Sequence, residues 1–164
     1  MTTLVVDGYN AIHAIPDVRT QADKSLLRAR SEIIALSREY ARVSGFIGDV
    51  KVVFDGDDRY RYLDKEGVDR DPAQIFSATG EGDDKIIEVV KECSRKGKVI
   101  IASNDNYVRN NACAHGAVPI NSQDLIGKKA PLDPNLSRDW KKLDKAARAA
   151  ITRAYSKHLG ISKG

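Results

Sequence analysis

The sequence has only two cysteines and no long apolar run. Cys93 and Cys113 lie twenty positions apart, without the Cys-x-x-Cys or histidine-rich spacing of zinc sites, so we expect both to be buried thiols. No apolar stretch approaches the roughly 20 residues needed to cross a bilayer, and no basic leader precedes the first strand-like run. These absences predict a protein of a reducing, cytoplasmic compartment that has no membrane partner.

Histidine is scarce as well, which limits the available acid–base chemistry. His13, His115 and His158 are scattered along the chain, and we expect each to be structural or exposed. The second aspartate of the aspartyl-phosphate phosphatases is also missing, because Tyr9 stands two positions after Asp7. The sequence therefore argues against both a histidine-based and an aspartyl-phosphate mechanism.

Charge is distributed unevenly along the 164 residues. Residues 128–164 carry 10 Lys or Arg against 3 Asp, whereas residues 1–127 carry 17 Lys or Arg against 20 Asp or Glu. We expect residues 1–127 to form the main domain, and 128–164 to be a basic linker and C-terminal amphipathic helix packed on it. The basic surface could bind a polyanion, or it could simply be a solvated helix face.

Short apolar runs alternate with amphipathic segments. We predict strands at three strong runs and two weaker ones: Thr3 to Val6, Lys51 to Phe54 and Val99 to Ala102, then Ala73 to Ala78 and Val118 to Ile120. Predicted helices run from Leu26 to before Gly45, capped by Asp23 or Ser25, from Asp83 to about Cys93, and from after Asp105 to before Gly116. Strands that are apolar on both faces indicate a parallel sheet covered on both sides, hence a three-layer α/β/α sandwich.

Acidic residues follow the three strongest predicted strands. Asp7, Asp55 and Asp105 should emerge at the same edge of the sheet, and we expect Asp7-Gly8 to open into a loop. Clustered carboxylates repel one another unless a cation compensates, and an oxygen-only ligand set favours Mg²⁺ or Mn²⁺ over zinc. At the start of the next helix we assign Asp83 to the cap and Asp84 to the metal. Taken singly, each acid could be a turn or cap residue.

Three further polar residues accompany these acids. Asn10 could hold a metal-bound water or a scissile phosphate, or it could stabilise the turn after Asp7. Ser103 and Asn104 could orient Asp105 through hydrogen bonds, or serve as capping residues.

These blocks resemble the YacP-like NYN ribonucleases, a branch of the PIN-like nuclease superfamily. The matching blocks lie between Met1 and about Ile126: Leu4-Val5-Val6-Asp7-Gly8-Tyr9-Asn10 with Ile12 and Pro16, Val53-Phe54-Asp55-Gly56, Gly82 to Glu88, and Ser103-Asn104-Asp105. The resemblance implies a PIN-like sandwich that cleaves RNA endonucleolytically with Mg²⁺ or Mn²⁺. It assigns Asp7, Asp84 and Asp105 to the metal, and it matches Asn10 and Asp55 to motif positions of the catalytic site.

Two segments have the chemistry to bind RNA. Arg59-Tyr60-Arg61-Tyr62 alternates cations with aromatic rings, which suits single-stranded RNA unless the tyrosines simply cover the core. In the predicted helix from Ser137 to about Leu159, the cations that point away from the apolar stripe could bind an RNA backbone or the ribosome: Lys141, Lys142, Lys145 and Arg148. The Trp140 side of that helix could instead mediate oligomerisation, and the oligomeric state stays open.

The preferred hypothesis is a metal-dependent endoribonuclease acting on single-stranded RNA such as mRNA. The alternative is an inactive RNA-binding or ribosome-associated module with the same fold. Metal binding would distinguish the two, because a pure binding module has no need for Mg²⁺.

Overall fold

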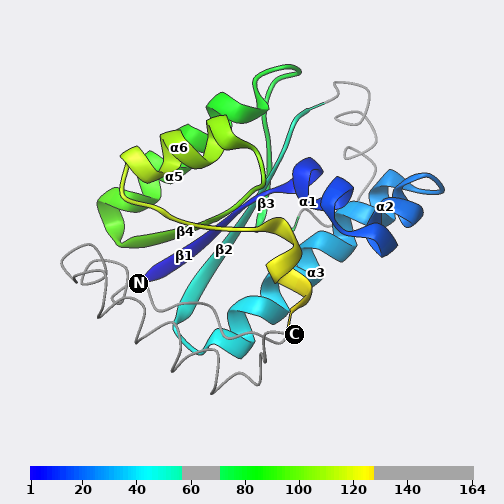
Figure 1. The fold of residues 1–164 in the computed structure, drawn as a ribbon, viewed down its shortest axis with the longest axis horizontal. Helices are drawn as coiled ribbons and strands as arrows, with labels where there is room; N and C mark the ends of the chain where they lie inside the picture. The colour runs from blue at the N-terminus through cyan, green and yellow to red at the C-terminus, as the bar shows by residue number, and fades with distance from the viewer. Residues whose placement is uncertain (57–70, 128–164) are drawn as a thin grey trace, which may run out of the picture. The chain divides into compact units, whose positions relative to one another are not determined.

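The computed structural model describes residues 1–56 and 71–127. Its centre is a five-stranded sheet in the order β3-β2-β1-β4-β5, and all four neighbouring pairs are parallel (Figure 1). The strands are β1 (Thr2–Asp7), β2 (Ile47–Phe54), β3 (Gln74–Phe76), β4 (Lys98–Ala102) and β5 (Val118–Ile120). Each predicted strand is therefore present, and the predicted parallel sheet is confirmed.

Helices cover both faces of this sheet. The segment between β1 and β2 forms α1 (Gly8–Ala14), α2 (Pro16–Ala22) and α3 (Leu26–Ser44). The opposite face carries α5 (Gly82–Lys96) and α6 (Asn106–Ala114), and a 3₁₀ helix, η2 (Ser122–Ile126), follows β5. Figure 1 shows α5 and α6 on one side of the sheet and α3 on the other, which confirms the three-layer α/β/α sandwich.

Successive residues of β1 point into two different cores. Leu4 and Val6 pack with the α1–α3 layer, whereas Val5 packs with α5 and α6, and all three are fully buried. Side chains alternate between the faces of a strand, so a strand covered on both sides must be apolar throughout. This requirement explains why the central strands appear in the sequence as uninterrupted apolar runs.

The segment after β1 corrects one prediction. Asp7-Gly8 does not open into a loop, because Asp7 caps α1 and its carboxylate accepts a hydrogen bond from the Asn10 N–H at 3.3 Å. Pro16 then starts α2, a position that suits its fixed φ and missing N–H. Both helices have seven residues, too few for the periodicity that reveals a longer helix.

The longest described helix has the predicted ends. The Ser25 hydroxyl accepts a hydrogen bond from the Arg28 N–H at 3.3 Å, so Ser25 rather than Asp23 is the cap of α3. Gly45 ends the helix at φ 73°, a left-handed conformation that glycine adopts without strain.

The two cysteines differ in burial. Cys93 is buried in α5 as predicted, but the prediction for Cys113 is wrong, because its side chain is exposed. On α6 the buried residues are Val108 and Ala112, and the next position turns about 100° away from that face. Among the described residues no helix is both long and apolar enough to span a membrane. The predicted C-terminal helix and its Trp140 face lie outside the described residues, and the division at residue 128 stays a prediction.

Candidate active site

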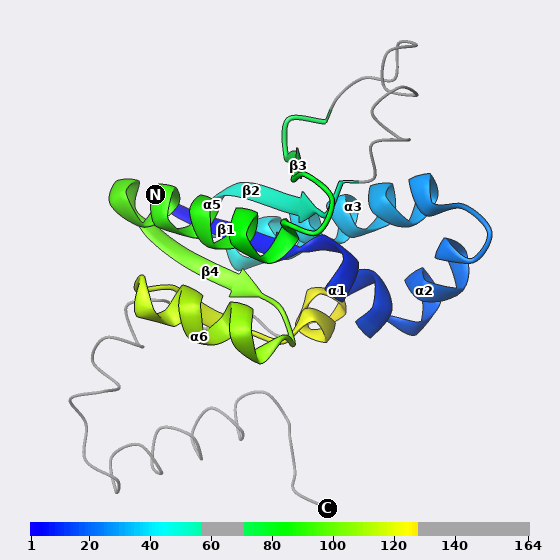
Figure 2. The same ribbon diagram turned by 90° about the horizontal axis from the view of Figure 1, so that it is seen from above.

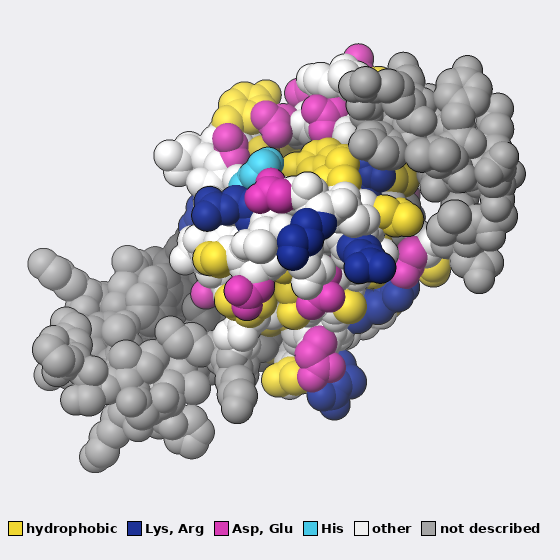
Figure 3. Space-filling view, turned by 90° about the vertical axis from the view of Figure 1, so that its right-hand side faces the viewer, with side chains coloured by type: hydrophobic (Ala, Val, Ile, Leu, Met, Phe, Trp, Pro, Cys, Tyr) yellow, Lys and Arg dark blue, Asp and Glu magenta, His cyan; other side chains and the backbone are white. Residues whose placement is uncertain are grey.

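All the strands run toward one end of the sheet, and β1 passes directly into α1 there (Figure 2). From β1 the chain continues on the α3 side, whereas from β4 it continues on the α6 side. In parallel sheets, such a reversal opens a crevice beyond the carboxyl ends of the two adjacent strands. Figure 3 views this end of the sheet, and acidic side chains gather on it close to a histidine.

A pocket of about 340 Å³ occupies this end of the sheet. Four carboxylates line it, from the ends of β1 and β2, the first turn of α5 and the cap of α6: Asp7, Asp55, Asp83 and Asp105. Asn10, His13 and Tyr9 also line the pocket. The structure thus brings together Asp7, Asp55, Asp105 and Asn10 from the predicted catalytic set with Asp83, which was predicted to be a cap, and it adds Tyr9 and His13.

Asp7, at the end of β1, is partly buried. Its carboxylate accepts hydrogen bonds from the Asn10 N–H and, at 3.0 Å, from the Ser103 hydroxyl. Burial above all, and then the charges of Asp83 and Asp105, raise its pKa from 3.8 to about 6, and the two hydrogen bonds only partly oppose this rise. The ionised site therefore holds excess negative charge at neutral pH.

Ser103 links Asp7 to Asp105. The Ser103 hydroxyl donates to Asp7 and accepts from the Asp105 N–H at 3.1 Å. Asp105 caps α6 by accepting from the Val108 N–H at 3.0 Å. Ser103 is itself fully buried, so this chain of bonds fixes the two carboxylates relative to each other.

Asn10 is held by groups that come from far along the chain. Its side-chain oxygen accepts from the Asn104 N–H and the Ser122 hydroxyl, both at 2.9 Å. The Asn104 side chain accepts from the Ser122 N–H and donates to Gln123, so Asn104 supports Asn10 and η2 rather than Asp105. With its oxygen engaged, Asn10 has its NH₂ group left to bind a ligand in the pocket.

Asp55 is fixed on the other side of the pocket. It accepts hydrogen bonds from the Ser77 hydroxyl at 3.1 Å and from the Gly80 N–H at 3.0 Å. Gly82 lies so close that a Cβ there would stand 3.0 Å from the Asp55 Cβ. A glycine at this position lets the start of α5 approach the end of β2.

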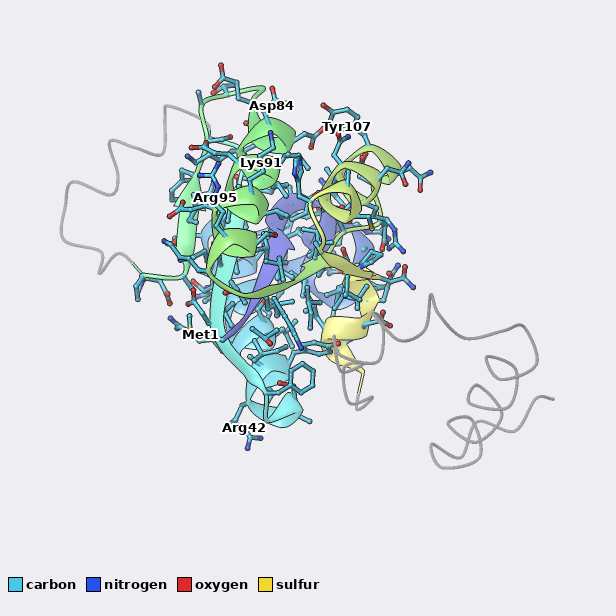
Figure 4. All side chains as sticks on the ribbon, turned by 90° about the vertical axis from the view of Figure 1, so that its left-hand side faces the viewer. Met1, Arg42, Asp84, Lys91, Arg95 and Tyr107 are labelled. Carbon is cyan, nitrogen blue, oxygen red and sulfur yellow. The ribbon has the colours of Figure 1, made fainter. Side chains whose placement is uncertain are left out.

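The structure corrects the assignment at the start of α5. Glu81 occupies the cap position without a side-chain cap bond, so the predicted capping role of Asp83 is wrong. Asp83 instead lines the pocket, and its pKa is raised by burial and by the charges of Asp105, Asp84 and Asp55. Asp84 does not line the pocket, because the next helix position turns about 100° away. Figure 4 labels Asp84 at the start of α5.

The pocket has the donor chemistry for a hard divalent cation. All its acidic side chains are carboxylates, and burial, followed by the charges of neighbouring carboxylates, raises the pKa of Asp7 and Asp83. In the described part of the chain, however, no group of three or more acidic, histidine or cysteine side chains is close enough to hold one ion. The residues therefore fit a cation bound by one or two carboxylates and by water, which is the usual form of Mg²⁺ sites.

An aromatic and cationic stack lies behind the pocket. Arg30 is buried, with its guanidinium carbon 5.6 Å from the ring centroids of Tyr9 and Phe54 and 5.1 Å from that of Phe76. Arg30 also donates to the Tyr9 hydroxyl. A Cβ on Gly8 would stand 2.4 Å from the Phe54 ring, so only glycine fits beside Asp7.

Sequence reasoning missed several of these residues. Arg30 falls on the buried side of α3, yet a lone arginine among apolar positions does not reveal the three rings that it contacts. His13 lies two turns after Asp7 on α1, and it could have been found only if that helix had been predicted. The segment Arg59-Tyr60-Arg61-Tyr62 and the cations Lys141, Lys142, Lys145 and Arg148 lie outside the described residues.

Fold and pocket together define the class: an α/β/α domain of PIN-like architecture with a carboxylate site at the switch point of its sheet. The model of the YacP-like NYN domain matches residues 4–159, so the chain belongs to this family of nuclease-type domains.

One solved structure shares this fold over nearly its whole length. The crystal structure of a point mutant of Rae1 (YacP) from Bacillus subtilis superposes with a TM-score of 0.61 at 21% identity. The match covers 94% of this chain and 99% of that one. A search of curated proteins gives no significant match.

Proposed function

We propose that the protein is a Mg²⁺- or Mn²⁺-dependent endoribonuclease that cleaves single-stranded RNA, such as mRNA, in the cytoplasm. The observation that carries the proposal is the pocket in which Asp7, Asp55, Asp83 and Asp105 converge. Such a cluster destabilises the fold at neutral pH unless a cation offsets its charge. Membership of a nuclease-type family makes phosphodiester cleavage the reaction that best accounts for it.

One or two of the carboxylates of Asp7, Asp83 and Asp105 would hold the cation, and water would complete its ligand set. When bound, a Mg²⁺ or Mn²⁺ ion lowers the pKa of a water and stabilises charge on the attacked phosphate. Asp83 here replaces the Asp84 of the sequence assignment, because Asp83 lines the pocket. Ser103 holds Asp7 and Asp105 in fixed positions relative to each other, because its hydroxyl bonds to both residues.

Two further pocket residues would bind and orient the substrate. Within residues 1–56 and 71–127 the Asn10 NH₂ group has no hydrogen-bond acceptor, so it can donate to a phosphate oxygen. Asp55 is tied to the backbone after β3, and it would add negative charge on the far side of the pocket. Asn10 therefore positions the phosphodiester, and Asp55 contributes to the field that attracts the cation.

An exposed aromatic side chain favours an unpaired RNA strand. Tyr107 lies in the first turn of α6, two residues after Asp105, and 56% of its surface is exposed. Exposed tyrosines next to a cationic or metal site stack on unpaired bases. The predicted contacts at Arg59 to Tyr62 would extend this surface, and the tail cations would bind an RNA backbone or the ribosome.

The proposal is tested by incubating labelled single-stranded RNA with the purified full chain and Mn²⁺ or Mg²⁺. Wild type, Asp7→Asn and an EDTA control are compared. We expect metal-dependent endonucleolytic products with the wild type only. Absence of cutting together with absence of metal binding by calorimetry would contradict the proposal and favour the inactive RNA-binding module.

A further inference from the structure

A second pocket, of about 450 Å³, lies between α5 and the turn that follows α6. Its lining residues are Lys91, Ser94 and Arg95 from α5, and His115 from the turn. In Figure 4, Lys91 and Arg95 are labelled along α5, on from Asp84. This basic pocket is separate from the acidic one, because the two share no residue.

Ser94 carries an unsatisfied hydroxyl in this pocket. Among the described residues, its Oγ is the one buried side-chain polar atom without a hydrogen-bond partner. Leaving a buried hydroxyl unpaired costs on the order of 1–3 kcal/mol, so native proteins usually supply a partner, water or a ligand. A hydroxyl beside cations is a donor suited to an oxyanion.

The cations in the pocket differ from their neighbours on α5. Lys85 pairs with Glu88 at 2.8 Å, and Lys96 pairs with Glu92 at 3.0 Å. Lys91 and Arg95, four positions apart and therefore on the same face, have no ion-pair partner within residues 1–56 and 71–127.

The helix dipole alone accounts for part of this arrangement. Cations near a helix C-terminus are favoured by the helix dipole, whatever else they bind. The dipole does not explain the unpaired Ser94 hydroxyl, nor the histidine that comes from a different element. Two unpaired cations, a free hydroxyl donor and an imidazole around one cavity together match the chemistry of a phosphate group.

We propose that this basic pocket binds a backbone phosphate of the RNA substrate, at a distance from the bond that is cut. The inference rests on the proposed function. Ser94 and Arg95 lie 11 and 12 positions after Asp83 on α5, which at 1.5 Å per residue is roughly 17–18 Å along the helix. A few nucleotides of extended RNA span that length, so one strand can reach both pockets.

The test is the binding of a fluorescent single-stranded RNA to the full chain, measured by anisotropy in EDTA so that no cleavage occurs. We expect Lys91→Gln/Arg95→Gln to weaken binding roughly fivefold. The slope of log affinity against log salt should fall by about 0.7 for each lost phosphate contact. The control, Lys24→Gln/Lys96→Gln, removes the same charge outside the pocket and should change binding less than about twofold.

Two results would overturn the inference: equal weakening by the two double variants, or no RNA binding by the wild type. Cleavage at saturating RNA and Mn²⁺ separates this inference from the proposed function. Lys91→Gln/Arg95→Gln should retain the wild-type maximal rate, whereas Asp7→Asn should bind RNA and fail to cut it.

A second arm distinguishes RNA from free phosphate as the source of the anion. The NMR signals of Ser94 and His115 are followed during titration with the RNA and, separately, with inorganic phosphate. We expect saturable shifts with RNA at far lower concentration than with phosphate. The reverse order of affinities would overturn the assignment to RNA.

Discussion

The two ends of α5 line pockets of opposite charge, an acidic pocket at its start and a basic pocket near its end. At its start, Asp83 joins three other carboxylates around a pocket in which burial and mutual repulsion raise pKa values. Near its end, Lys91 and Arg95 are exposed cations beside Ser94. Both ends suit the helix dipole, which favours anions at the start and cations at the end.

The two ends differ in what they cost the fold. The acids at the start hold their charge partly out of water and next to like charges, so they lower the stability of the metal-free protein. The cations near the end are solvated and impose no such penalty. The comparison therefore supports placing the proposed reaction at the start of α5.

The largest expected effect comes from two adjacent acids at the start of α5. Asp83→Asn should lower the rate of metal-dependent RNA cleavage by about 10²- to 10³-fold, because it removes a carboxylate from the pocket. Asp84→Asn makes the same charge change one position later and should lower the rate less than about threefold. Equal losses, or a larger loss with Asp84→Asn, would return the metal to Asp84.

The next largest effect is the change with pH in the free energy of unfolding that Asp7 causes. Its pKa is 3.8 in an unfolded chain and about 6 in the fold, so folding favours the protonated form. Stability is therefore lost as pH rises from about 4 to 6, and ionised Asp7 costs about 3 kcal/mol above that range. Urea unfolding in EDTA at pH 7.5 should show Asp7→Asn to be more stable than the wild type.

The same comparison at pH 4 should show little difference between Asp7→Asn and the wild type, because Asp7 is then protonated in the fold. Asp84→Asn is the matched control, because it makes the same charge change at an exposed position. A destabilised Asp7→Asn at pH 7.5 would contradict the burial cost.

The smallest effect concerns Tyr107, the exposed side chain in the first turn of α6. Tyr107→Ala should raise the KM for single-stranded RNA at least about fivefold, because one stacked base is worth about 1 kcal/mol or more. Tyr107→Phe should keep the wild-type KM. Leu27→Ala removes a similarly exposed side chain from α3 and serves as the control. An identical KM for Tyr107→Ala would exclude stacking there.

The sheet and the long helices could be predicted because burial alone determines them. A strand covered on both faces, such as β1 or β4, must be apolar at every position, and such runs are visible in a single sequence. The acids at the strand ends could be predicted to lie close together, since the carboxyl ends of parallel strands lie at one edge of the sheet. Asp7, Asp55 and Asp105 were located in this way.

The choice between Asp83 and Asp84 depended on a helix boundary, which a sequence defines only to within a residue or two. Because α5 begins at Gly82, Asp83 stands inside the first turn rather than at the cap, and it lines the pocket. The basic pocket could not be predicted either. It needs His115 to lie beside Ser94, and only the packing of α6 on α5 brings them together.

The stack of Arg30 with Tyr9, Phe54 and Phe76 predicts where mutations that abolish cleavage should lie. The Phe54 ring fills the space beside Gly8, and Gly8 follows Asp7 directly, so the stack determines where that carboxylate stands. A random-mutagenesis screen for lost cleavage should therefore recover two kinds of position. One kind is the acids themselves, and the other is this stack, where conservative changes that keep the fold should misplace Asp7.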